Sequence, residues 1–383
     1  MDIERLKASF KNLFQAEPII VKSPGRINII GEHTDYNGGF VMPAAINKAI
    51  YVAVSKRTDN EIHLYSESYQ QFHHCSIESI EKSDKGWANY ILGVADQLKK
   101  RGYKFGGFNL YLDGNVPLGA GLSSSAALEC ATVFAIDYLN NLGISQMDRA
   151  LISQKAEHVF AGVNCGIMDQ FASVFGKKDY AVMLDCRSMK YVYIPLKLDG
   201  YKLVLLNTNV KHSLSDSAYN TRRSQCEQGV AWVSEFVAGV TSLRDVNRVM
   251  LEQYVKPKSL EVFQKCNFVV EEIERVVKSA DQLANGDLAA LGNLMFQTHE
   301  GLSKDYEVSC AELDFLVELV KNDNAVLGAR MMGGGFGGCT INIVKDEAID
   351  ELIVRAKIDY KKRFNLELDA YVVQTDNGSE LEN

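Results

Sequence analysis

Hydrophobic and polar positions alternate between helical and strand-like periods along the chain. Apolar residues at helical spacing predict helices over residues 3–14, 88–100 and 127–138, and mainly helical structure from about 216 to 323. Runs rich in β-branched and aromatic residues, or with strict alternation, predict strands over residues 50–54, 62–65, 72–77, 108–112, 180–184, 191–196 and 202–206. The first three runs are typical of successive antiparallel strands.

The last 60 residues follow the order strand, glycine-rich loop, strand, helix and strand, with the final strand over 370–373. Strand clusters and helix clusters are segregated along the chain, which indicates a mixed α+β fold. A chain of 383 residues is long enough for two domains. The turn-like residues 197–200 give the best boundary, so we expect domains over 1–200 and 201–383.

Composition narrows the class of protein. The chain is 46% hydrophobic and 23% charged, as in ordinary globular proteins, and its net charge is −8. This acidic balance argues against a general binder of nucleic acid or anionic membrane. Any anionic ligand would need a local positive field from a few arginines, a metal ion or helix N-termini.

The termini and cysteines bear on location. Residues 1–7 carry alternating charges where a signal peptide would be apolar, and no uncharged run reaches the ~20 apolar residues of a membrane span. Eight cysteines are scattered without a C-x-x-C motif. We expect reduced thiols and a cytoplasmic protein.

Residues 115–126 contain two closely spaced glycines and then three serines, between a predicted strand and a predicted helix. That order directs backbone N–H groups and the positive helix end toward an anion, so it favours phosphate binding. The loop has no lysine and is not a Walker A motif. Serine capping of an ordinary helix is the alternative.

A second glycine-rich segment, residues 333–338, formally matches G-x-G-x-x-G. A dinucleotide site would require these glycines to open a helix. Residues 339–344 instead alternate like a strand, so the loop is expected to join two strands. It is then either a tight hairpin or a flexible loop pressed against another loop or a ligand.

Two further segments carry possible chemistry. Glu32, His33 and Asp35 can converge only in a loop, where they suit the hydroxyl groups of a polar small molecule. A solvated charged turn is the alternative, and the spacing is not typical of zinc. Asp169 stands among apolar residues, where burial raises a carboxyl pKa unless a cation compensates. Alternatively, Asp169 caps the next short helix.

Three segments in this order resemble the GHMP small-molecule kinases: residues 23–35, 117–126 and 332–338. Residues 25–36 resemble the narrower signature of the galactokinase family. The resemblance extends from near residue 20 to the last strand. It implies a two-domain α+β fold, with an N-terminal domain like the second domain of ribosomal protein S5, a ferredoxin-like C-terminal domain, and the active site between them.

The resemblance also implies residue roles. The ATP phosphates would lie on the loop of Gly119, Ala120, Gly121, Leu122, Ser123, Ser124 and Ser125. Mg²⁺ would be held by Ser125 and Glu157. The sugar would be lined by Glu32, His33, Thr34, Asp35, Gly166 and Tyr219. Asp169 would be the base facing the sugar hydroxyl, with Arg26 beside it and the γ-phosphate.

The implied activity is ATP-dependent phosphorylation of α-D-galactose at its C1 hydroxyl, in the Leloir pathway of galactose catabolism. No nucleic acid, membrane or protein partner is expected. Three alternatives stay open: a relative that acts on N-acetylgalactosamine, arabinose or galacturonate, a non-catalytic galactose sensor, and a Rossmann dehydrogenase. The complete Ser123–Ala126 stretch argues against the sensor, and the strand after Gly338 argues against the dehydrogenase.

Overall fold

The computed structural model describes residues 1–117, 119–211 and 215–382. Its largest sheet has six strands in the order β13-β1-β3-β6-β4-β5. Their bounds are β1 Ile19–Asn28, β3 Pro43–Lys56, β4 Glu61–Ser66, β5 Gln71–Ser76, β6 Phe108–Gly114 and β13 Glu380–Glu382. The expected antiparallel pairing of β4 with β5 is confirmed. Pairing of β3 with β4 is wrong, because β6 lies between them, antiparallel to β3 and parallel to β4.

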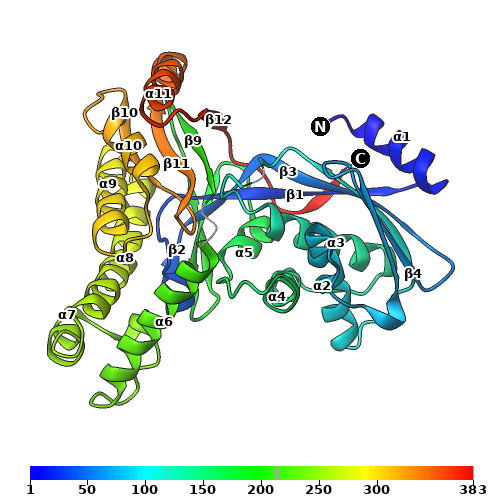
Figure 1. Ribbon diagram of the computed structural model, residues 1–383, viewed down its shortest axis with the longest axis horizontal. Coiled ribbons are helices and arrows are strands. Elements are labelled where there is room, and N and C mark those ends of the chain that lie inside the picture. Colours follow the sequence, from blue (N-terminus) through cyan, green and yellow to red (C-terminus); the bar gives the residue numbers. More distant parts are fainter. Residues whose placement is uncertain (118, 212–214, 383) are drawn as a thin grey trace.

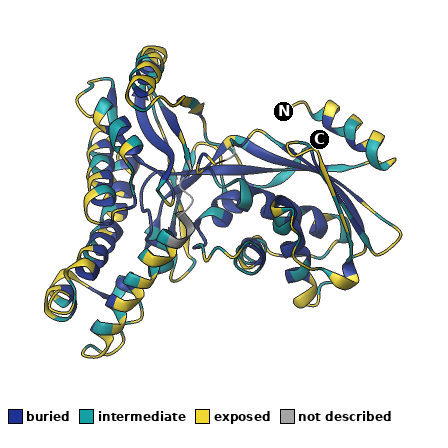
Figure 2. Ribbon diagram, viewed as in Figure 1, coloured by how far each residue is buried: buried dark blue, intermediate teal, exposed yellow. Residues whose placement is uncertain are grey.

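This sheet is covered on both faces (Figures 1 and 2). The helices of this half are α1 Ile3–Phe14, α2 Gly86–Lys100, α3 Ser124–Asn140, α4 Gln146–Ala156 and α5 Met168–Phe175. In β3, Val52 and Val54 pack in the main core with α2 and α3, whereas Tyr51 and Ala53 pack with α1. This alternation follows from the two-residue period of a strand, and it places α1 alone on the outer face.

A small sheet and three short helical turns complete the first half. The sheet has the order β2-β7-β8, with bounds β2 Phe40–Val41, β7 Tyr180–Asp185 and β8 Tyr191–Pro195. The turns are the 3₁₀ helices η1 Asp35–Asn37 and η2 Ile77–Ser79, and the π-helical turn η3 Glu157–Ala161, which continues α4. The η1 turn places Asp35 outside any strand.

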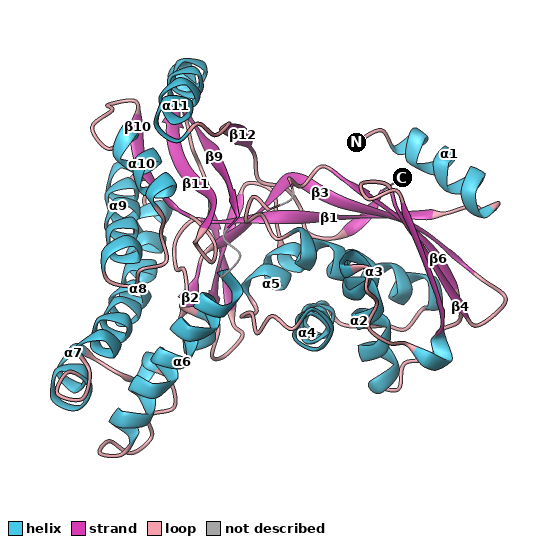
Figure 3. Ribbon diagram, in the orientation of Figure 1, coloured by secondary structure: helices cyan, strands magenta, loops and turns pink. Residues whose placement is uncertain are grey.

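The second half combines a four-stranded antiparallel sheet with long helices (Figure 3). The sheet has the order β10-β11-β9-β12, with bounds β9 Tyr201–Lys211, β10 Val326–Met331, β11 Gly337–Lys345 and β12 Asp369–Val373. The helices and turns are α6 Ser215–Ser234, η4 Leu243–Asp245, α7 Arg248–Met250, η5 Leu251–Val255, α8 Leu260–Ala284, α9 Leu288–Lys304, α10 Ala311–Val320, η6 Asp346–Ala348 and α11 Ile349–Phe364. Val204 and Leu206 pack with α10 and α11, whereas Leu203 and Leu205 join the main core, which includes residues of α8 and α9 and continues into the first half.

The end of the chain returns to the first sheet. β13 pairs with β1 through Ile20 and Glu382, and Thr375 forms a bridge with Ile46. We propose that the domain boundary lies near residue 200, with the last residues crossing back to complete the N-terminal sheet. None of the helices in the described ranges has the length and apolar character needed to span a bilayer.

The second glycine-rich segment is the hairpin loop between β10 and β11, as its sequence predicts. Four of its glycines (Gly333, Gly335, Gly337 and Gly338) have positive φ, a region that favours glycine. No helix follows the loop, so the dinucleotide interpretation is excluded.

Candidate active site

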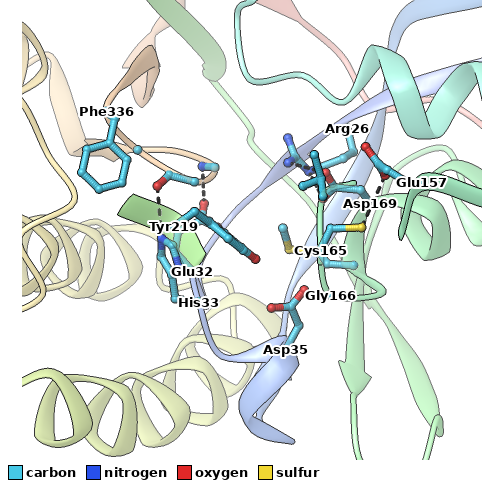
Figure 4. A pocket seen from close by; sticks show the side chains of 15 residues that line it. Arg26, Glu32, His33, Asp35, Glu157, Cys165, Gly166, Asp169, Tyr219 and Phe336 are labelled. Atoms are coloured by element: carbon cyan, nitrogen blue, oxygen red, sulfur yellow. Dashed lines mark hydrogen bonds and ion pairs between the residues drawn. The ribbon is translucent and has the colours of Figure 1, made fainter. Parts of the chain in front are cut away.

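Most of the residues predicted to contact the sugar, together with Arg26, Glu157 and Asp169, come together around one cavity of about 270 Å³. Its lining includes Arg26, Glu32, His33, Asp35, Glu157, Gly166, Asp169, Tyr219 and the glycine loop at 333–335. Figure 4 shows Arg26, Asp169 and Glu157 on one side and Glu32, His33 and Tyr219 on the other, with Asp35 beside Gly166. Segments more than 300 residues apart therefore meet at this point.

Arg26 and Asp169 form a bidentate ion pair at the centre of the cavity. Arg26 Nε and Nη2 donate to the two carboxylate oxygens of Asp169 at 2.8 and 3.0 Å. The pairing of β1 shifts register between Pro24 and Arg26, and the Arg26 N–H donates to the Leu122 carbonyl at 3.1 Å. A bulge of this kind re-aims a side chain, and here it holds the guanidinium beside the serine-rich loop.

The capping interpretations of Asp169 and Ser123 are wrong. Ile167 occupies the N-cap of α5, and Asp169 accepts hydrogen bonds from Arg26 and from the Ser123 hydroxyl instead. Ser123 is the N-cap residue of α3, but it has φ 60° and its side chain makes no capping bond. Both polar side chains are thus turned toward the cavity.

Asp35 is held against Gly166. Its carboxylate accepts the Tyr36 N–H at 2.9 Å, and a Cβ on Gly166 would lie 1.6 Å from Asp35 Oδ2. Only glycine therefore fits at position 166. Enclosure by protein raises the pKa of Asp35 to about 6, and the nearby Asp169 and Glu32 carboxylates act in the same direction.

His33 is buried and neutral near pH 7, because burial lowers its pKa to about 4. Its φ is +62°, which confirms that the segment is a loop. Nδ1 lies 2.7 Å from the Tyr36 hydroxyl, and Nε2 lies 3.3 Å from the Gly334 carbonyl oxygen. The His33 ring also packs against the Tyr219 ring, with centroids 5.2 Å apart.

Thr34 is placed differently from its neighbours. It is fully buried, its hydroxyl donates to the carbonyl oxygens of Gly31 and Phe40, and it is absent from the cavity lining. Through these hydrogen bonds Thr34 stabilises the loop that carries Glu32, His33 and Asp35.

Glu32 has a buried partner that the sequence motifs do not reveal. Arg330, on β10, donates to Glu32 Oε1 at 3.0 Å, and the exposed fractions of the two side chains are 0% and 2%. The same oxygen accepts the Gly333 N–H at 2.8 Å. The one available signal was a lone arginine within the apolar run of residues 326–332.

The serine-rich loop adopts the backbone expected of a phosphate cradle. Gly119, Gly121 and Ser123 all have positive φ, and α3 begins directly after them at Ser124. Leu118, within the motif at residues 117–126, lies outside the described residues. The carbonyl of Gly121 accepts a bond from Arg26 Nη1, which connects this loop to the ion pair.

A second cavity of about 300 Å³ adjoins the start of α3. Ser124 and Ser125 form one edge, and the rest is mainly apolar and aromatic, including Trp87, Val116 and Leu128. The sequence gives no signal for this cavity at its helical residues, because periodicity does not distinguish a core face from a ligand-facing one.

Ser125 and Glu157 meet at the junction of the two cavities. The Ser125 hydroxyl is hydrogen-bonded to Glu157, which also accepts from Gln170 Nε2 at 2.6 Å and from the Cys165 thiol at 3.4 Å. Burial, followed by the nearby Asp169 charge, raises the pKa of Glu157. A hydroxyl and a buried carboxylate near a second carboxylate, Asp169, suit a hard divalent cation.

Comparison with known proteins agrees with this geometry. The galactokinase galactose-binding signature matches residues 8–56, and the N- and C-terminal domains of GHMP kinases match residues 89–177 and 279–362. A galactokinase of Thermotoga neapolitana is 43% identical over 358 residues, covering 94% of this chain and 98% of the relative. A galactokinase of Clostridium acetobutylicum is 40% identical and covers 98% of each chain.

Solved structures show the same relationship. The crystal structure of Lactococcus lactis galactokinase complexed with galactose superposes with a TM-score of 0.95 at 34% identity, covering 99% of this chain and all of that one. Mevalonate kinase from Methanococcus jannaschii shares the fold, with a TM-score of 0.67 at 18% identity. These matches confirm the two-domain GHMP fold, and the chain belongs to the galactokinase family.

Proposed function

We propose that this chain transfers the γ-phosphoryl group of ATP to the C1 hydroxyl of α-D-galactose, giving α-D-galactose 1-phosphate and ADP, as the first chemical step of galactose catabolism by the Leloir pathway. The observation that carries the proposal is the Asp169 carboxylate, held by Arg26 and Ser123 between the sugar-lining loop and the serine-rich loop. The galactokinases of known sequence and the galactose complex support it.

Asp169 is suited to accept the proton of a sugar hydroxyl. An ionised carboxylate can accept about four hydrogen bonds, and three are supplied by Arg26 and Ser123. The remaining site, on Oδ1, is available to a hydroxyl in the cavity. As the oxygen of the sugar hydroxyl attacks the γ-phosphorus, the hydroxyl proton passes to Asp169. The bond between the γ-phosphorus and the β–γ bridging oxygen breaks, and ADP leaves with the bridging oxygen. Arg26 lies where it can stabilise charge on the transferred group.

The two cavities divide the substrates between them. The serine-rich loop, residues 119–125, and the N-terminus of α3 suit the phosphates of ATP. The adjoining apolar cavity with Trp87 suits the nucleobase, because flat aromatic rings stack on such surfaces. Asp35, Glu32, His33 and Tyr219 would face the sugar from the opposite side.

Mg²⁺ would be held by Ser125 and Glu157. Among the described residues no group of three or more His, Cys, Asp or Glu side chains is arranged for a metal. Two protein donors are nevertheless enough for Mg²⁺, which keeps several waters and also binds substrate phosphates. When bound, the ion would neutralise charge on the β- and γ-phosphates during transfer.

Ser125→Ala and Glu157→Gln should each raise the Mg²⁺ concentration that gives half-maximal activity, by roughly 10-fold or more, because each change removes one oxygen ligand or its charge. Activity titrated against Mg²⁺ at fixed ATP tests this. Thr132→Val, about two turns further along α3 and outside the lining of both cavities, is the matched control and should leave the midpoint unchanged. Unchanged midpoints in both test variants would remove these residues from the metal site.

A panel of sugars tests the proposed function itself. ADP formation from Mg-ATP should occur with galactose and be at least ~10²-fold lower in kcat/KM with glucose, because a site built to hydrogen-bond one hydroxyl rejects its misplacement. N-acetylgalactosamine, arabinose and galacturonate measure tolerance at C2 and C6. Galactose binding without ADP formation would identify a sensor, and faster use of another sugar would reassign the substrate.

We also place the enzyme in the cytoplasm, working without a nucleic-acid, membrane or protein partner. All eight cysteines are free, and four of them (Cys130, Cys226, Cys266 and Cys339) are buried, as expected of packing residues in a reducing compartment.

A further inference from the structure

Arg330 is among the largest fully buried side chains of the protein, and it does not line either cavity of the active site. From β10 it reaches the first half of the chain, where Nε donates to the Ile29 carbonyl at 2.9 Å and Nη2 donates to the Asn28 carbonyl. Nη1 donates to Glu32 Oε1 at 3.0 Å and to its neighbour's carbonyl at Met331. Three of these four hydrogen bonds join the end of β1 and the sugar-lining loop to the strand that leads into the glycine loop.

The sugar-lining loop holds two consecutive residues of the glycine loop, Gly333 and Gly334. Glu32 Oε1 accepts the Gly333 N–H at 2.8 Å, and His33 Nε2 lies 3.3 Å from the Gly334 carbonyl oxygen. A carbonyl oxygen can only accept, so the neutral His33 ring carries its proton on Nε2 and Nδ1 accepts from Tyr36. Since Tyr36 donates to His33, the Tyr306 hydroxyl, 2.9 Å away, must donate to Tyr36. Each proton in this series of hydrogen bonds, from Tyr306 through Tyr36 to His33, therefore has one consistent position.

The other side of the glycine loop lies against the serine-rich loop, residues 119–125. A Cβ on Gly333 would lie 3.6 Å from the Gly121 carbonyl oxygen, and one on Gly338 would lie 3.5 Å from that of Ala120. The Gly121 carbonyl also accepts from Arg26. The glycine loop is therefore the shared neighbour of the groups proposed to bind sugar and the groups proposed to bind nucleotide.

The glycine loop has little side-chain packing of its own at Gly333 and Gly334. Glycines lose more backbone freedom on ordering than other residues, and the left-handed positions leave few side chains to pack. At Gly333 and Gly334 the loop is held by its hydrogen bonds with Glu32 and His33. Its far end is held separately, by the Phe336 N–H donating to the Val308 carbonyl at 2.7 Å and by the Thr208 hydroxyl donating to Gly338. A sugar that fixes these two side chains would order the glycine loop, and a nucleotide binding against the ordered loop would lose less conformational entropy.

We propose that Arg330 is a positioning residue that couples galactose binding to nucleotide binding. It does so by holding Glu32 where the Glu32 carboxylate anchors the glycine loop against the serine-rich loop. The inference rests on the proposed function, since it assigns the two ligands to the two sides of that loop. Coupling of this kind is reciprocal, so each ligand must raise the affinity of the other by the same factor.

The experiment measures the Kd of a non-hydrolysable ATP analogue with Mg²⁺, by calorimetry, in the absence and presence of saturating galactose. In the unaltered protein, galactose should tighten analogue binding by a factor in the range of ~5–150. In Arg330→Lys the charge is kept, but one ammonium group cannot reach the four acceptors that the guanidinium serves, so the factor should fall below about 2. Both ligands should still bind singly to the variant.

Two further variants make the result specific. His33→Phe leaves the buried ion pair intact and removes the donor to Gly334, so it should also lower the coupling factor and serves if Arg330→Lys does not fold. Thr208→Val is the matched control, because the Thr208 hydroxyl donates to the Gly338 carbonyl at 2.9 Å from the side of β9. It should weaken analogue binding equally with and without galactose.

Opposite results overturn the inference. These are a coupling factor near 1 in the unaltered protein, an unchanged factor in the folded Arg330 and His33 variants, or an equal loss of coupling in Thr208→Val. Failure of the proposed function is distinguishable, because the unaltered protein would then form no ADP from Mg-ATP with galactose, whatever its coupling factor.

Discussion

Asp169→Asn should lower kcat for galactose phosphorylation by ~10²–10⁴, the usual contribution of a general base, while the Kd for galactose changes only a few-fold. The amide has nearly the same shape and keeps one acceptor oxygen, so the cavity persists. It cannot take the hydroxyl proton, and its NH₂ group faces Arg26, which can only donate. Single-turnover phosphoryl transfer, with galactose binding measured separately by calorimetry, divides chemistry from binding.

Asp137→Asn is the matched control for loss of a buried ion pair. Asp137 is 3% exposed and accepts from Arg149 Nε and Nη2 at 2.9 and 2.6 Å, in helices away from the cavity. It should lower the free energy of unfolding without changing kcat. A near-normal kcat in Asp169→Asn would exclude Asp169 from the chemistry, whereas equal kcat losses in both variants would assign its effect to the fold.

Many residues that line the cavity could be predicted because two of the three motif segments, residues 23–35 and 332–338, contribute to its lining, whereas Gly166 and Tyr219 were assigned by the resemblance alone. The alternating residues after Gly338 correctly indicate a hairpin loop between two strands. The capping interpretation of Asp169 was wrong for a reason that lies outside its own segment. Its partner Arg26 is 143 positions away, and no local pattern reports such a pairing.

Contacts between distant segments account for what could not be predicted. Arg330 has no motif around it, and its importance comes from backbone carbonyls and a carboxylate about 300 residues earlier. Trp87 lies on a helix whose period is equally consistent with core packing. The insertion of β6 between β3 and β4 is likewise a choice among pairings that each strand's pattern permits.

Asp35→Asn should have opposite effects on stability and on activity. Its carboxyl has a pKa of about 6 in the folded protein against 3.8 when unfolded, so near pH 7 the folded state holds a charge that its surroundings disfavour. That difference corresponds to at most about 3 kcal/mol of lost stability, and the neutral amide recovers part of it. The same change removes a charged acceptor for the sugar, which is worth roughly 1.5–3 kcal/mol, or ~10–100-fold in kcat/KM for galactose.

The pH dependence of this stabilisation has a definite sign. Between pH 3.8 and about 6 the folded protein binds more protons at Asp35 than the unfolded chain does, so acidification favours folding of the unaltered protein through this group. The Asn variant lacks that gain. The Tm of the Asn variant should therefore exceed that of the unaltered protein by a few degrees at pH 7.5, and this difference should shrink by pH 5. Calorimetry of ligand-free samples measures it.

Activity supplies the complementary test. If ionised Asp35 binds the sugar, kcat/KM of the unaltered enzyme should fall about tenfold per pH unit below pH 6, and the Asn variant should lack that limb. Asp185→Asn is a control that should be destabilised at pH 7.5, because at Asp185 burial is outweighed by the backbone N–H groups of Arg187 and Ser188, which lower the pKa. A destabilised Asp35→Asn would show that the cavity compensates the charge fully. An unchanged kcat/KM would show that Asp35 shapes the Gly166 turn without binding galactose.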